Sequence, residues 1–318
     1  MGLVRGSDSV PGSPEPKPDV TAAEPLPATR SDREPFAPVD WLLFAAMGLI
    51  WGSSFLLIKV ALGAFHPGLI TWARVGLGAA ALAFLPGART PIAPADRRSL
   101  VLLSIVWVAI PFTLFPLAEE HINSAVTGLL NGATPFFTGL IGAVWFHRTP
   151  RGPQRWGIAV GFLGIALVSL GTSVEGGTAV IGVVMVLAAT LCYGFATNMA
   201  YPLQQRYGSV AVMAKMLALA TLWTTPFGIL GLGRSEFAWD AAVAVLALGV
   251  VGTGFAFVFM ATLVGRVGGP RASFITYLIP VVSLALGVTF LDETVAAVAL
   301  WGVVLVMAGA VLASRRER

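Results

Sequence analysis

The chain has 318 residues, of which 56% are hydrophobic and only 11% are charged, and its formal net charge is +4. A soluble domain carries roughly 25% charged residues to cover its surface, whereas the mean hydropathy of this chain is +0.82. The composition therefore excludes an ordinary soluble domain and predicts a protein whose surface faces lipid. Nucleic-acid binding is excluded too, because the basic residues lie in short loops between apolar runs and form no basic soluble face.

Residues 1–39 form the first segment, which contains eight prolines, mixed charges and no apolar stretch of the signal-peptide type. Such a composition cannot bury enough apolar surface to fold. We therefore expect a disordered, proline-rich cytoplasmic tail.

Ten continuous apolar runs follow, each close to the roughly 20 residues that a helix needs to cross a bilayer. They predict an all-α integral membrane protein with ten transmembrane helices. The single cysteine, Cys192, lies in the sixth run and is expected to be a packing residue. The expected helices span residues 41–61, 69–85, 100–117, 124–146, 154–170, 178–200, 209–232, 241–263, 270–291 and 295–313.

Arginines occupy every second loop between these runs, whereas the alternate loops contain only Arg234. Positively charged loops stay in the cytoplasm, so both termini are predicted to be cytoplasmic, which requires an even number of spans. The arginine-bearing loops and ends contain Arg89, Arg97, Arg98, Arg148, Arg151, Arg155, Arg206, Arg266, Arg271, Arg315, Arg316 and Arg318.

The two halves of the chain resemble each other at an offset of 145 residues, which places Pro135 on Pro280 and Trp156 on Trp301. The same offset aligns Gly142 with Gly287, Thr149 with Thr294, Gly157 with Gly302, Gly164 with Gly309 and Leu167 with Leu312. Because five spans precede the second half, it enters the membrane in the opposite sense. We expect a 5+5 inverted-topology repeat, residues 41–172 and 178–314, with a substrate site between the halves, as in many secondary transporters.

Short motifs mark several spans and give the chain a family resemblance. They are Trp51-Gly52-Ser53-Ser54-Phe55 and Lys59 in the first span, Arg74 in the second, Ser124-Ala125 and Pro135 in the fourth, Pro280 in the ninth, then Leu291-Asp292-Glu293 and Trp301-Gly302. In this combination, residues 41–314 resemble the EamA-like branch of the drug/metabolite transporter superfamily. The resemblance implies export or exchange of amino acids, other metabolites, drugs or nucleotide sugars.

The first half departs from the pattern of this family at the end of its fourth span. His147 and Arg148 stand there at the positions that Asp292 and Glu293 occupy in the second half. The acid that the family has at the end of the fourth span is therefore missing.

Polar and aromatic residues of the first span are candidates for substrate contacts, with structural roles as the alternatives. Trp51 could contact the substrate, face lipid or fill space in the packing. Ser53 and Ser54 could offer hydroxyl groups to a cavity, or bond back to the carbonyls of their own helix.

Pro135 and Pro280 each remove a backbone hydrogen bond within a span, and their matched positions suggest hinged or broken helices. Asn131, Thr276 and Tyr277 lie shortly before these prolines, so they are candidates for polar substrate contacts or for bonds between helices. Close helix packing is the expected role of Gly128, Gly132, Gly157 and Gly161.

The charged residues within the expected spans are all basic, namely Lys59, Arg74 and Lys215. A charge inside a membrane costs at least about 2.5 kcal/mol and indicates a function by default, although Lys59 and Lys215 lie close enough to span ends to reach the headgroups. Arg74 lies deeper, and its planar guanidinium suits a carboxylate; the alternative is that it caps free carbonyls or reaches the headgroups. Lys59, Glu119 and Glu293 are expected at the outer mouth.

The acids also bear on energy coupling, since proton relays usually use an acid or a histidine inside the helix bundle. No expected span has such a group away from its ends. The sequence therefore predicts exchange or gradient-driven facilitation, with Glu119 and Glu293 as the exceptions to test.

These features together predict a plasma-membrane secondary transporter of small organic metabolites that works by alternating access. Amino acids and related carboxylate-bearing solutes are favoured, because the spans contain basic residues and no acid that would suit a cationic drug. The expected partners are a small-molecule solute and the lipid bilayer, without nucleic acid, metal or cofactor and with the number of subunits left open.

Three other functions remain as rivals. One is drug efflux within the same superfamily, and another is a non-transporting scaffold or receptor. The third is a membrane-embedded lipid-modifying enzyme, which would need a polar cluster such as Glu119, Glu120, His121 and Asn123. No catalytic residue is predicted, because the histidines share no metal-ligand spacing and no phosphate-binding loop is present.

Overall fold

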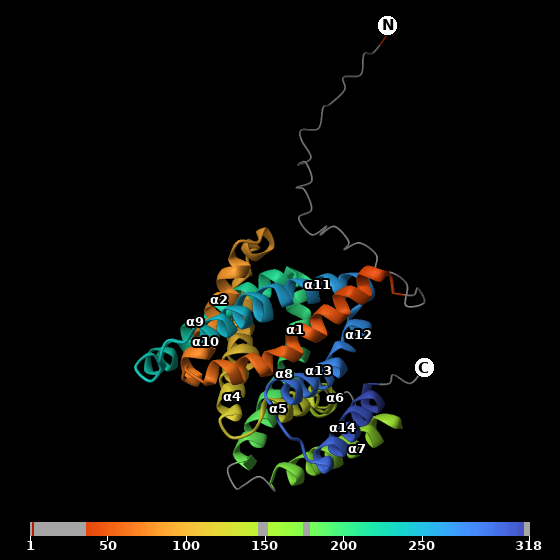
Figure 1. The fold of residues 1–318 in the computed structure, drawn as a ribbon. Coiled ribbons are helices and arrows are strands. Elements are labelled where there is room, and N and C mark those ends of the chain that lie inside the picture. Colours follow the sequence, from red (N-terminus) through yellow and green to blue (C-terminus); the bar gives the residue numbers. More distant parts are fainter. Residues whose placement is uncertain (1, 3–35, 146–151, 174–178, 315–318) are drawn as a thin grey trace.

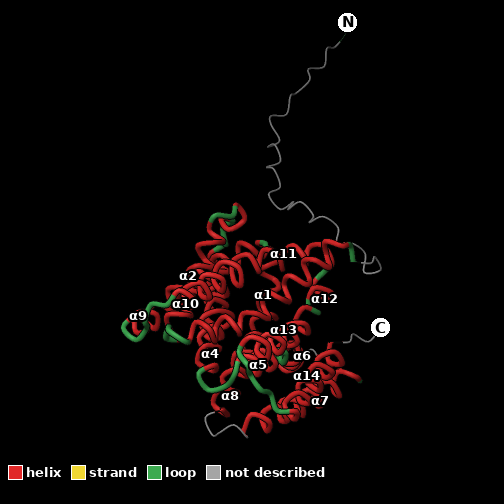
Figure 2. Tube along the Cα trace, in the orientation of Figure 1, coloured by secondary structure: helices red, strands yellow, loops and turns green. Residues whose placement is uncertain are grey.

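The computed structural model describes residues 2, 36–145, 152–173 and 179–314, and the elements within these ranges are all helical (Figure 1 and Figure 2). The tail expected at 1–39, apart from its last residues, and the departure at His147 and Arg148 lie outside the described residues. The first half contains α1 (Pro38–Leu62), α2 (Pro67–Ala83), η1 (Pro86–Arg89), η2 (Pro94–Asp96), α3 (Arg97–Leu103), η3 (Ser104–Ala109), α4 (Ile110–Glu119), α5 (Ser124–Asn131), α6 (Thr134–Val144) and α7 (Pro153–Ser173). The second half contains α8 (Ala179–Tyr207), α9 (Ser209–Leu232), α10 (Trp239–Leu246), η4 (Ala247–Phe255), α11 (Ala256–Val267), α12 (Gly269–Ala272), α13 (Ile275–Phe290) and α14 (Ala297–Ser314).

Each of the ten apolar runs coincides with a helix or with consecutive helical pieces, so the expected all-helical architecture is confirmed. Within the described residues, five helical segments are long and apolar enough to cross a membrane; shorter apolar helices accompany them. The long segments are Pro38–Leu62, Pro94–Glu119, Ala179–Tyr207, Ser209–Leu232 and Trp239–Val267.

The surface of the protein is apolar over much of its area, as a membrane protein requires. Several exposed tryptophans lie at helix ends, where aromatic rings meet the lipid headgroups in membrane proteins. Trp41 near the start of α1 is 59% exposed, Trp156 near the start of α7 is 72% exposed and Trp239 at the start of α10 is 77% exposed. Large aliphatic side chains are exposed too, among them Leu42, Leu163, Leu222 and Leu230.

The helix contacts have the symmetry that two similar halves would give. A shift of 145 residues carries α1 onto α8, α2 onto α9 and α7 onto α14. α1 packs against α10, α11 and α13, and its counterpart α8 packs against α4 and α6. α2 contacts its own counterpart α9, and α7 lies beside α14 (Figure 1).

The runs predicted as the third and eighth spans each contain a π-helical segment at matching positions in the two halves, η3 in the first half and η4 in the second. π-helical turns are rare and occur often at functional sites. α2 packs tightly on η4, because a Cβ at Gly78 would lie 2.7 Å from Thr253 and a Cβ at Gly249 would lie 2.5 Å from Leu77. The third turn of α2 is thereby held against the side chain of Thr253.

The fourth span is interrupted between α5 and α6, directly before Pro135, whereas α13 continues through Pro280. The predicted break is thus present between α5 and α6 in the first half, and it is absent from α13 in the second half. Pro280 packs instead against α5, where a Cβ at Gly132 would lie 2.8 Å from its ring, and a Cβ at Gly128 would overlap Ser283. Both glycines therefore permit the close approach of α5 to α13, which is the packing role expected for them.

α7 and α14 approach each other so closely that glycines meet glycines. A Cβ at Gly164 would lie 2.5 Å from the carbonyl oxygen of Gly302, and a Cβ at Gly309 would overlap the amide nitrogen of Gly161. Small residues allow such backbone contact between membrane helices. Two of the glycine matches found in the sequence, Gly157 with Gly302 and Gly164 with Gly309, therefore lie at this helix pair.

Candidate functional site

Arg74 lies in the interior of the bundle, on the face of α2 that meets η4 and α4. The residue is only 6% exposed. Its Nε donates a hydrogen bond of 3.1 Å to the hydroxyl of Thr253, and its guanidinium carbon lies 4.2 Å from the centre of the Phe112 ring. The hydroxyl of Thr253 donates in turn to the carbonyl of Leu248 at 2.9 Å, which orients its oxygen toward Arg74.

A proline in α4 helps to position this cluster. Pro116 has no amide hydrogen, so the carbonyl of Phe112 one turn earlier lacks its helical partner. That carbonyl accepts a 2.9 Å hydrogen bond from the hydroxyl of Thr71 on α2. The bond ties α2 to α4 one turn away from Arg74 and holds Phe112 against the guanidinium.

Nε of Arg74 bonds to Thr253, and the terminal nitrogens make no hydrogen bond to any residue that the structure describes. The one bonded nitrogen, Nε, contacts a hydroxyl group and not a free carbonyl, and the side chain is enclosed by protein. The geometry thus differs from both structural alternatives, carbonyl capping and contact with headgroups. A planar fork with free donors is the arrangement that binds a carboxylate through two parallel hydrogen bonds.

Lys59 lies near the end of α1 and caps the end of α4. Its ammonium donates a 2.6 Å hydrogen bond to the backbone carbonyl of Glu119 and a 3.3 Å bond to the carbonyl of Ile122. The carbonyl of Glu119 belongs to the helix end, where no amide of the same helix reaches it, and the carbonyl of Ile122 lies in the turn between α4 and α5. Lys59 is therefore held inside the protein by the chain that follows α4.

Glu119, the last residue of α4, is completely buried, with 0% of its surface exposed. Both of its carboxylate oxygens lack a hydrogen-bond partner among the described residues. The ammonium of Lys59 is directed at the backbone carbonyl of Glu119 and forms no ion pair with the carboxylate. An unpaired buried carboxylate is rare in folded proteins and calls for a specific explanation.

A cavity of about 930 Å³ opens at this end of the bundle. Lys59 and Glu119 belong to its lining, as expected for the predicted outer mouth, whereas Glu293 does not. The other lining residues are Leu62, Gly63, Ala64, Phe65, His66, Pro67, Glu120, Arg234, Glu236, Phe237 and Ala238.

Glu293 follows α13 and caps the first turn of α5. One carboxylate oxygen accepts a 2.8 Å bond from the amide of Ser124, and the other accepts bonds from the amide of Ala125 and the hydroxyl of Ser124, at 2.8 and 3.0 Å. A negative charge is favourable at a helix N-terminus, where amides are unpaired. The carboxylate is thus occupied by α5 and connects the two halves of the chain.

We expect Glu293→Gln to lower the free energy of unfolding by about 1–2 kcal/mol, because it removes the charge from three charge-assisted hydrogen bonds. The thermal unfolding midpoint of the purified protein in detergent measures this loss. Asp292→Asn is the matched control, since Asp292 is exposed and asparagine tolerates its positive φ of 50°. Equal midpoints for the two variants would contradict the capping role.

The remaining predicted contact residues of α1 contact groups of the protein itself. Ser53 and Ser54 both donate to the carbonyl of Ile50 in their own helix, at 3.1 and 3.2 Å. Trp51 packs edge to face with Phe257 of α11, with ring centres 6.2 Å apart. The serine contacts are those of their structural alternative, and Trp51 lies between α1 and the second half.

The polar residues near the two prolines also contact their own segments. Asn131 ends α5, and its backbone carbonyl accepts a 2.8 Å bond from Thr134. Thr276 donates to the carbonyl of Ser273 at 2.7 Å, and the ring of Tyr277 lies 6.1 Å from that of Phe274. None of these three is brought next to Arg74 by a described contact.

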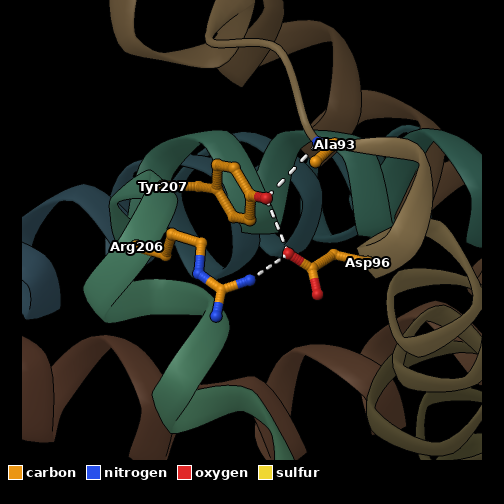
Figure 3. Close-up of polar contacts among 4 residues, drawn as sticks. All are labelled: Ala93, Asp96, Arg206 and Tyr207. Atoms are coloured by element: carbon orange, nitrogen blue, oxygen red, sulfur yellow. Dashed lines mark hydrogen bonds and ion pairs between the residues drawn. The ribbon is translucent and has the colours of Figure 1, made fainter. Parts of the chain in front are cut away.

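The end of the bundle predicted to be cytoplasmic is joined by ion pairs between the two halves. The carboxylate of Asp96, at the end of η2, accepts hydrogen bonds from Arg206 and from the hydroxyl of Tyr207, both at the end of α8 (Figure 3). The same hydroxyl accepts a 3.3 Å bond from the amide of Ala93. Arg206 is 63% exposed, so its ion pair contributes little to stability and serves mainly to fix the position of the loop.

A second and more buried ion pair lies at the start of α1. Asp40 is 0% exposed and pairs with Arg266 at the end of α11. Lys215 of α9 donates to the carbonyls of Ala88 and Thr90 at 2.8 and 2.7 Å. First-half and second-half elements are therefore bonded together at this end, while the cavity lies at the opposite end.

Sequence reasoning missed several residues of this arrangement. Asp40 and Tyr207 lie at helix ends where a polar residue is unremarkable, and Phe112 is one aromatic residue among many. Thr253 offers a faint signal, because it is a polar residue between two glycines in an apolar run. Pro116 gives a stronger signal, since a proline inside a span always frees a carbonyl for a partner.

Comparisons with known proteins identify a matching family and related proteins. A family model described as the EamA-like transporter family matches residues 40–170 and again residues 180–315. A protein of Escherichia coli (strain K12) named a probable amino-acid metabolite efflux pump is 27% identical over 285 residues, which cover 85% of this chain and 93% of that protein. A probable terminal-alkyne amino-acid exporter of Streptantibioticus cattleyicolor is 27% identical over 287 residues, covering 87% and 93% of the two chains.

The fold has a counterpart among solved structures. One crystal structure superimposes with a TM-score of 0.59 at 21% sequence identity, and the match covers 86% of this chain and 96% of that chain. At this sequence identity the structural similarity supports the fold alone.

Proposed function

Because the chain belongs to the EamA-like transporter family, we propose that it is a secondary transporter that exports or exchanges small carboxylate-bearing metabolites, with amino acids as the leading class. The observation that carries the proposal is the buried guanidinium of Arg74, whose terminal nitrogens have no partner among the described residues. The names of two relatives, an amino-acid metabolite efflux pump and an amino-acid exporter, point to the same class.

Alternating access is supported by the difference between the two ends of the bundle. At one end a cavity of about 930 Å³ reaches Lys59 and Glu119. At the other end, Asp96 with Arg206 and Asp40 with Arg266 bond the halves together. We take this as a state open toward the predicted external face, in a plasma-membrane protein with ten spans in two inverted repeats and cytoplasmic termini. Opening the opposite end requires these ion pairs to separate, and the interruption before Pro135 and the proline at Pro280 are the proposed hinges.

The rival functions find less support in the site. An enzyme would need a polar cluster that includes Glu119 and Asn123. Asn123 accepts a 3.0 Å hydrogen bond from the amide of Val126, and Glu119 is buried. These side chains therefore do not converge on a substrate. A pump for cations needs a negative group within the membrane, but two of the three charged neighbours of Glu119 are the basic residues Lys59 and Arg74.

A thermal-shift panel on the purified protein tests the proposal, because a ligand stabilises the folded state by RT ln(1 + [L]/Kd), about 2.7 kcal/mol at a hundredfold excess over Kd. We expect L-amino acids to raise the unfolding midpoint and the matching amino-acid amides, which lack the carboxylate, to leave it unchanged. Equal shifts from acids and amides, or shifts from cationic drugs alone, would contradict a carboxylate-binding site.

A further inference from the structure

We propose that Arg97 and Arg98, at the start of α3, bind the headgroup phosphate of an anionic phospholipid in the cytoplasmic leaflet. The proposal goes beyond the transport function above and does not depend on it. Three features carry it: two arginines without a partner, a loop that the other half of the chain holds in place, and an exposed apolar side chain one helical turn from the arginines.

The first feature is the pair of free guanidinium groups. Arg97 and Arg98 are exposed, and the side chain of neither forms an ion pair or a hydrogen bond with a described residue. The cations that contact the same loop from the second half are occupied instead, Arg206 by Asp96 and Lys215 by two backbone carbonyls. The two arginines of α3 therefore keep all their donors for an anion from outside the protein.

The acid of this loop does not neutralise them. Asp96 directly precedes the two arginines, but its carboxylate accepts hydrogen bonds from Arg206 and from the hydroxyl of Tyr207 (Figure 3). Residues 84–99 contain three arginines and one acid, and Arg206 and Lys215 bring two further cations to them. The loop thus has an excess of positive charge, which attracts anions.

The second feature is that the loop is held in place by the second half. The hydroxyl of Tyr207 accepts a 3.3 Å hydrogen bond from the amide of Ala93, and Lys215 donates to the carbonyls of Ala88 and Thr90 at 2.8 and 2.7 Å. A segment that is already ordered loses little conformational freedom when a ligand binds. The two arginines that follow this segment are therefore positioned before the lipid arrives.

The third feature distinguishes a lipid from a soluble phosphate. Arg98 and Leu102 are four residues apart and lie on one face of α3. Leu102 is 42% exposed, whereas Leu100 and Leu103 on the opposite side are buried. Because α3 begins the third apolar run, Leu102 lies on the hydrocarbon side of Arg98. A phosphate bound at Arg98 thereby has its acyl chains beside Leu102, a contact that a soluble phosphate cannot make.

The lipid would also affect the contact that closes this end of the bundle. Asp96 and Arg206 join the two halves there, while the excess cations on both sides of the contact repel one another. An anionic headgroup offsets this repulsion. Bound lipid therefore stabilises the joined halves and raises the unfolding midpoint of the protein.

Titration of the purified protein in a neutral detergent with phosphatidylglycerol tests the site, because the unfolding midpoint at each lipid concentration gives the affinity. We expect phosphatidylglycerol to raise the midpoint and phosphatidylcholine with the same acyl chains to leave it nearly unchanged. The shift should shrink in about 0.5 M salt, since exposed charges are screened. Equal shifts from the two lipids would overturn the proposal without any variant.

The double variant Arg97→Gln, Arg98→Gln should bind phosphatidylglycerol about thirtyfold more weakly, because each arginine near an anionic headgroup contributes about fivefold, or about 1 kcal/mol. Both side chains are exposed, so the variant should fold as the parent does. Arg89→Gln is the matched control, with the same loss of charge in the same loop but outside α3. A loss of affinity as large in Arg89→Gln as in Arg98→Gln would show general attraction to a charged loop and refute a site at α3.

Two further measurements decide between a lipid and a soluble phosphate. Leu102→Ala should weaken the binding of phosphatidylglycerol by about threefold through lost apolar contact, whereas Leu230→Ala, which also removes an exposed leucine, should not. Glycerol 3-phosphate, which has the phosphate without the acyl chains, should not displace the lipid. Displacement by glycerol 3-phosphate together with an unchanged affinity in Leu102→Ala would assign the arginines to a soluble ligand and refute the lipid. None of these measurements involves transport, so they leave the proposed function to its own test.

Discussion

Replacing Arg74 with Gln is expected to reduce transport of carboxylate-bearing solutes by about a hundredfold, with little change in the amount of protein in the membrane. The guanidinium is buried, its terminal nitrogens have no described partner, and its Nε is held by Thr253. Loss of a charged, bidentate contact with a carboxylate costs about 3 kcal/mol, which corresponds to this factor. Arg74→Lys keeps the charge but loses the fork, so it should retain part of the activity.

The measurement is initial transport rate at matched membrane abundance, for amino acids and for a cationic dye. Arg89→Gln is the control, because Arg89 is exposed in a loop that connects α2 to α3. Thr253→Val should show a smaller decrease than Arg74→Gln, since it removes only the bond to Nε. If the parent exported the dye rapidly and Arg74→Gln did not change that rate, an anion-selective site would be contradicted.

Gly164→Ala is expected to destabilise the protein by about 3 kcal/mol, the upper part of the usual range for overpacking. The added Cβ would lie 2.5 Å from both the carbonyl oxygen of Gly302 and the amide nitrogen of Val306. These are backbone atoms, so no side-chain rotation relieves the overlap and α7 must move away from α14. Gly309→Ala is the symmetric change in the second half and should have a similar effect.

Thermal unfolding in detergent, together with membrane abundance in cells, measures this prediction. Gly265→Ala provides the control, because a Cβ there meets no atom within 4 Å and alanine favours a helix over glycine by about 1 kcal/mol. Gly265→Ala should therefore be neutral or stabilising. If Gly164→Ala and Gly309→Ala unfolded at the temperature of the parent, the contact between α7 and α14 would not have the described closeness.

The apolar runs predicted where the helices lie, and the small residues predicted where helices pack closely. A run of apolar residues of bilayer length forms a helix because its backbone groups bond within the segment, so the positions of α1, α8 and α9 follow directly from the sequence. The interruption before Pro135 and the packing role of Gly128 and Gly132 follow from equally local rules.

The repeat found in the sequence also anticipates how the helices pair. An offset of 145 residues was read from a few glycines, prolines and a tryptophan. The same offset relates the contacts of α1 to those of α8 and places α2 against α9. The π-helical segments η3 and η4 are related by the same offset, but no residue pattern in either segment predicts a π-helix.

The candidate site was less predictable, because its properties come from contacts between distant segments. Arg74 was identified by its depth in a span, yet its partner Thr253 lies 179 positions away. Glu119 and Glu293 looked alike in the sequence, as acids at span ends. In the structure Glu293 is fully hydrogen-bonded and Glu119 has no partner among the described residues, and only tertiary packing distinguishes them.

The helix-capping role of Glu293 shows what an acid at the matching position of the first half would do. The offset of 145 places Arg148 at the position of Glu293, and it places Ser124, which Glu293 caps, at Gly269. Arginine has only donors and cannot accept bonds from the amides at the start of α12. By residue type, the acid that caps the start of α5 therefore has no counterpart in the first half.

Counterflow by the purified protein in liposomes is the most direct test of the central claim, that this chain carries carboxylate-bearing amino acids across a membrane. Liposomes are loaded with an unlabelled mixture of L-amino acids, and the uptake of the labelled mixture is followed. We expect labelled amino acids to accumulate transiently above their equilibrium level in loaded liposomes, but not in empty ones or in liposomes loaded with the matching amides. Equal uptake into loaded and empty liposomes, or equal stimulation by acids and amides, would contradict the account.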